Sequence, residues 1–381
     1  MRSDLTETLE YFEERLAQFI GVKHTIVTGS GRAALEFTLK SLGLEGKSLL
    51  CSCYTCSIVP QTILKAGAYP YFVDIRANLS LDTDNIPENL SQTCSAILMN
   101  YLYGCPTDLV EEILDFAQQN ELIIIEDVAQ SFGAEIGNRK AGSIGEVGIF
   151  SFPKVFFPLF RGGCIATNRD DVAEKARLLR TKFQTSPRKI SIIQTNLKIR
   201  GSSISKIFRP IRGSEYPPQS KEWGNNIYYY YESTTPHHYW NLTENELEMG
   251  ISTLESFTYL KKIRSNLVKD ILMQIEEKWN GILTPVFPYR EEYVYSKIPV
   301  LMNPTQCEKI KSFLRSNRIL QNMNYRPLCN NSLFSGKSSI CSPCATSSYI
   351  SQYMIPLPVE PQMAQIFKNA CFAENLNHEK L

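Results

Sequence analysis

Short apolar runs alternate with amphipathic stretches along residues 22–167, and this alternation restricts the fold more than any other feature of the chain. The apolar runs are too short for helices, whereas the stretches between them repeat apolar residues at helical spacing. The expected strands are 24–27, 49–51, 71–73, 96–99, 122–125, 147–150 and 164–167, with helices at 32–42, 57–66 and 108–118. The pattern predicts an α/β fold with a mostly parallel, seven-stranded type of sheet flanked by helices.

The rest of the chain predicts a second, smaller domain. Residues 183–240 are polar and irregular and contain a run of four tyrosines, and a long helix is expected at about 244–277. At roughly 150 residues per domain, 381 residues correspond to two or three units. We therefore expect a large domain over 1–250, which includes the polar region, and a small α+β domain over 251–381.

The composition excludes several classes of protein. Forty basic and 39 acidic residues leave a net charge of +1, which argues against a general nucleic-acid-binding protein. No apolar run approaches the roughly 18 residues that a membrane span needs. The acidic, amphipathic start, with Leu5, Leu9 and Phe12 at helical spacing, differs from a signal peptide. We expect a cytoplasmic enzyme with no membrane and no nucleic-acid partner.

The eleven cysteines are expected to be ordinary thiols. Disulfides are rare in the cytosol. Cys341 and Cys344 have the spacing of zinc ligands, and Cys329 could be a third ligand. A structural zinc site needs four ligands, however, and no second close pair lies nearby in the sequence. Loop or core cysteines are therefore the favoured interpretation, with no metal expected.

A glycine-rich turn at Gly29-Ser30-Gly31 stands between the first expected strand and helix. It formally matches the dinucleotide pattern G-x-G-x-x-A, but that pattern also requires an acidic residue about 20 positions later. Leu50, Cys51 and Ser52 stand there instead, which disfavours NAD. The remaining interpretations are a phosphate site at the helix start, or glycines that serve only a tight turn.

An acidic pair and a lysine follow two other strands. Glu126 and Asp127 come directly after the run at 122–125, where a carboxylate faces the ligand crevice of an open sheet or caps a helix. Lys154 is surrounded by apolar residues, which lower an amine's pKa and make it a nucleophile, although a snorkelling surface lysine explains the same pattern. A phosphate cup, a strand-end carboxylate and a lysine are what pyridoxal phosphate (PLP) requires.

The order of these motifs resembles the DegT/StrS group of PLP-dependent sugar-nucleotide aminotransferases along nearly the whole chain. The segments that carry the resemblance are GSGRAALEFTLKSLGL, CYTCSIVPQTILKAGAYPYFVDI, NYLYGCPTDL, IIIEDVAQSFGAEIGNRKAGSIGEVGIFSF, YWNLTENELEMGI and YMIPLPVEP. The resemblance implies the aspartate aminotransferase-like fold.

The resemblance also implies roles for residues around the ring of the cofactor. Lys154 would bond to its aldehyde and move the proton between the substrate carbon and the cofactor. Asp127 would pair with the pyridine nitrogen, and Gln130 would contact the phenolic oxygen. The aromatic residue that stacks on the ring in the family corresponds to Cys56, with Tyr54 adjacent.

Four further residues would hold the phosphate. The resemblance assigns this role to the backbone amides of Gly31 and Arg32 and to Ser151. Asn241 would reach the phosphate from the neighbouring subunit, which implies a homodimer.

One spacing departs from the family. Its lysine commonly follows the serine by five residues, where Phe156 stands here, whereas Lys154 follows Ser151 by three. Lys140 is the nearest other lysine, in a turn expected to be exposed.

A separate feature is the stretch 175–212, which contains 11 Lys or Arg and no Asp or Glu. It is interpreted either as a solvated face or as a basic rim that attracts the diphosphate of a nucleotide sugar.

The expected function is a ping-pong transamination. Glutamate would donate the amino group, and a nucleotide-linked keto sugar would accept it. One alternative keeps PLP but acts on a cyclitol or other natural-product ketone, or catalyses dehydration. Another is a non-catalytic regulatory relative, favoured by the lysine spacing, and a third is an NAD dehydrogenase.

Overall fold

The computed structural model describes most of the chain. It covers residues 5–87, 93–106, 109–154, 159, 161–183, 239–317, 319, 325–331, 334, 336, 338–340 and 343–369, with the side chains of Lys154, Asn330, Ile340 and Asn369 excepted. Of the polar segment 183–240, only the two ends belong to this set. The basic stretch 175–212 is described only as far as residue 183.

Eight strands form the main sheet, in the order β1-β9-β8-β5-β4-β2-β3-β12. They are β1 (His24–Thr28), β2 (Ser48–Ser52), β3 (Tyr69–Val73), β4 (Cys94–Asn100), β5 (Ile123–Asp127), β8 (Val147–Ser151), β9 (Gly163–Thr167) and β12 (Ser339–Ile340). All pairs from β8 to β12 are parallel, whereas β9 runs antiparallel to β1 and β8. The seven strands from the first part of the chain confirm the predicted sheet, and β12 adds an eighth from far along the sequence.

Both faces of this sheet are buried, which explains why its strands are continuous apolar runs. Successive side chains of a strand point to opposite faces. In β4, Ile97 and Met99 therefore join one hydrophobic cluster, and Ala96 and Leu98 join another. All four side chains are almost completely buried.

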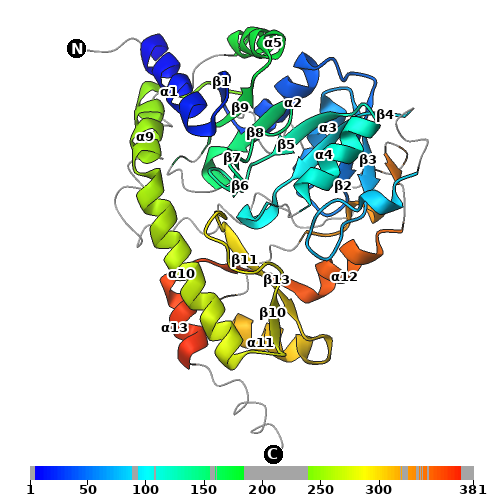
Figure 1. Ribbon diagram of the computed structural model, residues 1–381, viewed down its shortest axis with the longest axis vertical. Coiled ribbons are helices and arrows are strands. Elements are labelled where there is room, and N and C mark those ends of the chain that lie inside the picture. The colour runs from blue at the N-terminus through cyan, green and yellow to red at the C-terminus, as the bar shows by residue number, and fades with distance from the viewer. Residues whose placement is uncertain are drawn as a thin grey trace, which may run out of the picture.

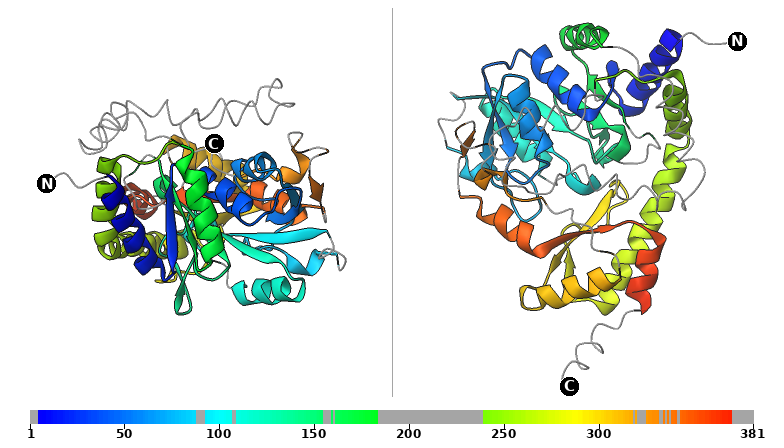
Figure 2. Two further views of the ribbon diagram at one scale, coloured as in Figure 1. Left: turned by 90° about the horizontal axis from the view of Figure 1, so that it is seen from above. Right: turned by 180° about the vertical axis from the view of Figure 1, so that it is seen from behind.

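Helices cover the two faces in separate layers (Figures 1 and 2). The helices α2 (Gly31–Ser41), α3 (Ile58–Lys65) and α5 (Asp170–Thr181) share the cluster that contains Ala96 and Leu98. The helices α1 (Leu5–Ile20), α4 (Val110–Gln119) and α9 (Glu244–Glu255) share the cluster on the other face. Helices α1 and α9 lie side by side although more than half of the chain separates them.

A second core is built around a small antiparallel sheet, below the main sheet in Figure 1. Its strands are β10 (Leu283–Pro285), β11 (Lys297–Met302) and β13 (Met354–Pro358), in the order β10-β11-β13. The helices of this region are α10 (Phe257–Lys278), α11 (Cys307–Ser316), α12 (Ala345–Tyr353) and α13 (Pro361–Asn369). Trp279 is fully buried between Phe313 and Phe367 at the centre of this core.

Short elements connect the longer ones. They are the strands β6 (Glu135–Ile136) and β7 (Arg139–Lys140) and the 3-10 helices η1 (Thr83–Asn85), η3 (Leu102–Gly104), η4 (Phe152–Lys154), η8 (Pro304–Gln306) and η9 (Leu328–Asn330). The long helix expected at 244–277 is in fact two helices, because the chain breaks at Ser256 between α9 and α10.

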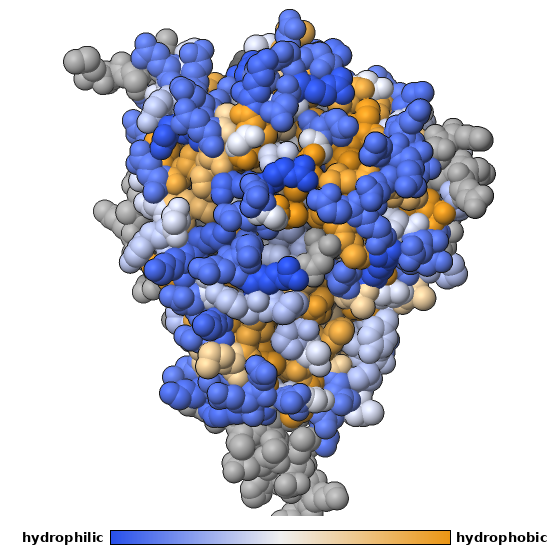
Figure 3. All heavy atoms as spheres, viewed as in Figure 1, coloured by the Kyte–Doolittle hydropathy of each residue, from blue (hydrophilic) through white to orange (hydrophobic). Residues whose placement is uncertain are grey.

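The surface in Figure 3 carries hydrophilic side chains over most of this face, with hydrophobic residues in smaller groups between them. Among the described residues, no helix combines the length and apolar character that crossing a bilayer requires.

Candidate active site

Three neighbouring parallel strands end in polar residues at one edge of the main sheet. Asn100 ends β4, Asp127 ends β5 and Ser151 ends β8. Asn100 and Asp127 are paired in the strand register, and Ile149 of β8 is paired with Asp127. Ligands of open α/β sheets bind at this carboxyl edge. The fold thus brings two of the sequence-predicted residues, Asp127 and Ser151, to the expected place.

The start of helix α2 packs closely against Ser151. The hydroxyl of Ser30 caps the helix by accepting a hydrogen bond from the amide of Ala33, at 3.1 Å. A Cβ atom at Gly31 would lie only 2.8 Å from the Cβ of Ser151, so a side chain at position 31 would force the two segments apart. The first amides of a helix carry partial positive charge and suit an anion. The start of α2 therefore lies directly against the end of β8, and the phosphate site expected at Gly31, Arg32 and Ser151 stays a prediction.

The glycine-rich turn is held to the end of β8 from a second side. The amide of Gly162 donates to the carbonyl of Gly29 at 2.9 Å, and Gly162 forms a bridge with Ser30. A Cβ atom at Gly163 would lie 2.4 Å from the carbonyl oxygen of Phe150 and 2.6 Å from the nitrogen of Gly31. Only glycine fits where the two segments approach so closely, which explains the Gly162-Gly163 pair.

Asp127 is buried, with 9% of its surface exposed, and its carboxylate is held by two donors. The amide of Ala129 donates to one oxygen at 3.1 Å, and the Asn100 side chain donates to the other at 2.7 Å. The oxygen of the Asn100 amide is buried and accepts no hydrogen bond from the described residues. An unsatisfied buried acceptor beside a buried carboxylate is costly, and such sites are commonly functional. Asn100 escaped the sequence analysis, although its place at a strand end was a signal.

Glu126, the other acid of the pair, has a structural role. It is fully buried and accepts hydrogen bonds from the Tyr101 hydroxyl and from the amides of Gly142, Ile144 and Gly145, at 2.7–2.9 Å. Burial raises the pKa of Glu126, and these four donors oppose the shift. Glu126 therefore fixes the loop before β8, and Asp127 is the acid available to a ligand.

Gln130 connects the strand edge to a group of tyrosines. Its side-chain oxygen accepts from the amide of Tyr103 at 3.1 Å, and its side-chain nitrogen donates to the hydroxyl of Tyr325 at 2.9 Å. Tyr103 has the left-handed φ of +60°, which residues other than glycine rarely adopt. The ring of Tyr54 packs edge-on against Tyr325, and its hydroxyl lies 3.3 Å from that of Tyr103. Burial raises the pKa of Tyr54.

Of these tyrosines, Tyr103 and Tyr325 were missed by the sequence analysis. Tyr325 lies almost 200 residues from Gln130, and no local pattern relates them. Cys56, which corresponds to the ring-stacking position, lies half-buried before α3, where its carbonyl accepts from the amide of Val59 at 2.9 Å.

The structure describes the whole of Lys140 but only the backbone of Lys154. The backbone of Lys154 ends the 3-10 helix η4, directly after Ser151, and its side chain lies outside the described part. The Lys140 ammonium forms an ion pair with Glu135 at 3.1 Å and lies over the ring of Phe19. Lys140 is half-buried, which corrects the expectation of an exposed turn, because the ion pair and the ring both cover it.

Asn241 lies near helix α1, in a hollow that Leu5, Leu9 and Val27 also line. Its side chain donates to the carbonyl of Phe183 at 2.9 Å, and its own carbonyl accepts from Arg161 at 2.8 Å. Arg161 also forms a two-pronged ion pair with Glu246 in the first turn of α9, at 2.9 and 2.8 Å. The segment that carries Asn241 is thus fastened beside Gly162. Its expected contact with a neighbouring subunit stays a prediction.

The two-core α/β fold, with a helix start packed on β8 and a buried carboxylate at the same strand edge, defines a class of α/β proteins that bind ligands at this edge. Comparison with known proteins gives the family. Residues 3–201, slightly more than half of the chain, match the DegT/DnrJ/EryC1/StrS aminotransferase family. The chain therefore belongs to this family.

Individual relatives share the same region. The GDP-perosamine synthase of Caulobacter vibrioides is 34% identical over 172 residues, which cover 44% of this chain and 46% of that protein. The pleiotropic regulatory protein of Geobacillus stearothermophilus is 31% identical over 180 residues, 46% of this chain and 48% of the relative. The chain thus matches about half the length of these curated relatives.

The fold comparison extends further. The crystal structure of a DegT DnrJ EryC1 StrS aminotransferase from Brucella abortus superposes with a TM-score of 0.73. The superposition covers 96% of this chain and 91% of that chain at 17% identity. It confirms the expected fold across both cores.

Proposed function

We propose that the protein is a PLP-dependent aminotransferase that moves an amino group from an amino acid, glutamate in the first instance, to a nucleotide-linked keto sugar. The observation that carries the proposal is the convergence of a buried carboxylate and a phosphate-type cradle at one strand edge. Family membership and the GDP-perosamine synthase relative support it.

The described residues fit PLP in two respects. Gly31 packs so closely on Ser151 that no side chain fits between them, and the first amides of a helix such as α2 suit a phosphate. The buried carboxylate of Asp127 suits a protonated ring nitrogen, and the Asn100 oxygen beside it offers a further acceptor.

Each residue then has a role. PLP supplies an aldehyde that joins an amine, and a ring that takes up the electron pair released at the substrate carbon. Asp127 would keep a proton on the pyridine nitrogen, and Asn100 holds that carboxylate in place. The Lys154 amine would hold the aldehyde and carry the proton to and from the substrate carbon. Gln130, oriented by Tyr103 and Tyr325, would contact the phenolic oxygen, and Cys56 would lie against the ring.

The wider features are part of the same proposal. The basic stretch 175–212 would attract the diphosphate of the sugar nucleotide. Two chains would form a homodimer in which Asn241 of one reaches the phosphate site of the other. The domain boundary near residue 250 and the cytoplasmic location belong to this proposal too.

A non-catalytic regulatory function is the second candidate. It is favoured by the spacing of Ser151 and Lys154 and by the relative called a pleiotropic regulatory protein. A catalyst that aminates a cyclitol would use the same site on a different substrate, and one that dehydrates a sugar would use it for a different reaction.

Borohydride reduction of the cofactor adduct tests the proposed aminotransferase function. Protein purified with added PLP is expected to show a visible absorption band that borohydride removes, and peptide mapping is expected to find the adduct on Lys154. K154A should lose both signals. K140A is the matched control, because Lys140 is ion-paired to Glu135 outside the cradle.

The other outcomes are equally informative. A folded protein without a band or an adduct contradicts the aminotransferase and favours the regulatory protein. An adduct on another lysine keeps the class and moves the site. Glutamate turnover with no acceptance of nucleotide-linked keto sugars would contradict the proposed substrate.

A further inference from the structure

Three cysteines from distant parts of the chain meet at one point. Cys53 follows β2, Cys329 lies in η9, and Cys344 directly precedes α12. Their three sulfur atoms all lie within 4.8 Å of one another. Cys53 and Cys344 are buried, with exposures of 0% and 7%, and Cys329 is half-buried. The sequence analysis considered Cys329 and Cys344 as zinc ligands but did not anticipate Cys53.

The backbone around this cluster is firmly held. The amide of Leu328 donates to the carbonyl of Cys53 at 2.8 Å, which fixes Cys329 beside β2. The strand β12 pairs with the adjacent strand β3 and leads towards Cys344. The three sulfurs therefore converge because of backbone contacts rather than side-chain rotation alone.

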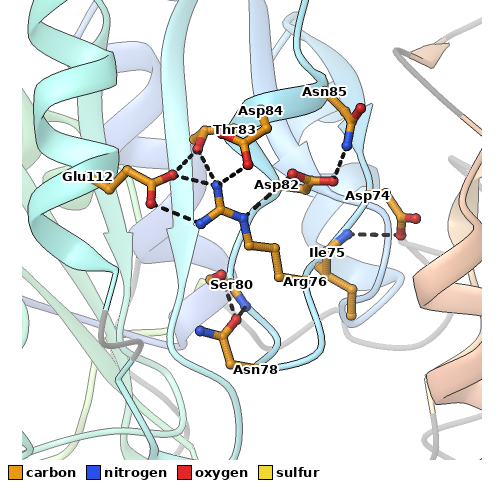
Figure 4. Close-up of polar contacts among 10 residues, drawn as sticks. All are labelled: Asp74, Ile75, Arg76, Asn78, Ser80, Asp82, Thr83, Asp84, Asn85 and Glu112. Atoms are coloured by element: carbon orange, nitrogen blue, oxygen red, sulfur yellow. Dashed lines mark hydrogen bonds and ion pairs between the residues drawn. The ribbon is translucent and has the colours of Figure 1, made fainter.

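Asp74, which follows β3, contacts both the start of α12 and the thiol of Cys53. Its carboxylate accepts from the amides of Thr346 and Ser347 in the first turn of α12, both at 2.9 Å, and so caps the helix. The thiol of Cys53 lies 2.9 Å from the Ser347 hydroxyl and 3.8 Å from an Asp74 oxygen. Figure 4 shows the Asp74 carboxylate turned away from the group around Arg76, with the amide of Ile75 donating to it. Asp74 thus holds the start of α12 beside the three cysteines.

We propose that Cys53, Cys329 and Cys344 bind a single Zn²⁺ ion. Sulfur atoms on a tetrahedral zinc lie about 3.8 Å apart, because each Zn–S bond is about 2.3 Å long. The three thiols need to close by no more than about 1 Å to reach this geometry. The three cysteines supply three of the four ligands that a tetrahedral zinc site needs, and a water molecule or the Asp74 carboxylate, which has an oxygen 3.8 Å from the Cys53 sulfur, would supply the fourth.

The ion would have a structural role close to the candidate active site. The segment that carries Cys329 also carries Tyr325, whose hydroxyl accepts from Gln130. Zinc would fasten this segment, and the start of α12, to the end of β2. The proposal does not depend on PLP, since none of these thiols belongs to the cradle at Gly31 and Ser151.

Metal analysis tests the proposal on the full chain without added PLP. Wild-type protein, produced with zinc under reducing conditions and dialysed, should retain about one zinc ion per chain. C53S, C329S and C344S should each lower the zinc content at least about tenfold under a competing chelator. C307S is the matched control, because Cys307 is also a buried thiol but starts α11 in the other core.

A second readout needs no variant. Wild-type protein loaded with cobalt(II) in place of zinc should show the intense sulfur-to-metal absorption of a tetrahedral thiolate site. Wild-type protein with less than about a tenth of an ion per chain and no such absorption would overturn the proposal. Zinc retained equally by all three cluster variants, or a disulfide between two of these cysteines in peptide mass spectra, would overturn it as well.

Discussion

The carboxylate of Asp127 owes its position to the periodicity of a strand. Successive side chains alternate, so Glu126 turns to the buried loop at Gly142 while Asp127 meets Asn100. Strand ends can be found in a sequence, and for this reason Asp127 and Ser151 were predictable. Tyr103 was not, because its role depends on a left-handed backbone and on a contact with Tyr325 that no local pattern encodes.

Replacing Asp127 should lower the rate of catalysis and leave cofactor binding almost unchanged. In D127N the shape of the side chain stays, but the negative charge that would hold a proton on the ring nitrogen is lost. We expect kcat to fall by about 10²–10³-fold while cofactor content changes little. Transamination rate and bound PLP are measured on the same samples. D115N, an exposed change in α4, is the control, and a D127N enzyme of nearly wild-type kcat would refute the assigned role.

At the scale of elements, one charged group joins the loop after β3 to helix α4 (Figure 4). The guanidinium of Arg76 donates two hydrogen bonds to Glu112, at 2.9 and 2.6 Å, and one to Thr83 at 3.2 Å. Asp82 and Asp84 lie 3.6 and 3.0 Å from the same guanidinium. Arg76 thus holds η1 and α4 together. The hydrogen bonds from Arg76 lower the pKa of Glu112.

The Arg76–Glu112 pair should stabilise the fold in a pH-dependent manner. Because the folded-state pKa of Glu112 is depressed, its contribution is present above the unfolded-state pKa and is lost as pH falls through the folded value. The side chain is 41% exposed, so solvent screening limits the effect of E112Q to about 1 kcal/mol at pH 7. Urea unfolding at neutral and acidic pH measures it.

The neighbouring residue supplies the comparison for that experiment. E111Q removes an exposed carboxylate whose ion pair with Arg139 is long, at 3.5 Å, and exposed to solvent. It should leave the free energy of unfolding almost unchanged. An E112Q destabilisation that persists undiminished in acid would show that packing, and not the ion pair, is responsible.

The whole molecule depends on contacts between segments far apart in the chain. The ion pair of Arg161 and Glu246 fastens the start of α9 beside the glycine turn, and α9 packs on α1. Asn241 lies within this junction, near the chain's N-terminal helix. The proposed homodimer would use this region to complete the phosphate site of a second chain.

Mixed dimers test that arrangement. K154A and N241A chains should each form dimers of low activity, because each lacks a different part of both sites. A hybrid has one site with both defects and one intact, so random mixing should restore about a quarter of wild-type activity. Activity is measured after co-refolding at equal amounts. No recovery in hybrids that form, verified by mass spectrometry with distinct tags, would place Asn241 in its own chain's site, whereas N241A dimers of wild-type activity would place it outside both sites.

The local periodicity of this sequence predicted seven strands of the main sheet, the helices α2, α3 and α4 and the strand-end acid, since hydrophobic alternation acts between near neighbours. The glycines between the first strand and helix also indicated a phosphate site, with a tight turn as the alternative interpretation. The periodicity could not show that one expected helix breaks at Ser256, or that β12 joins β3.

The meeting of Cys53 with Cys329 and Cys344, and of Gln130 with Tyr325, was decided only by the tertiary structure. These partners lie hundreds of residues apart, and their approach follows from how the chain returns from the small sheet to the edge of the large one. That return depends on the packing of both cores together.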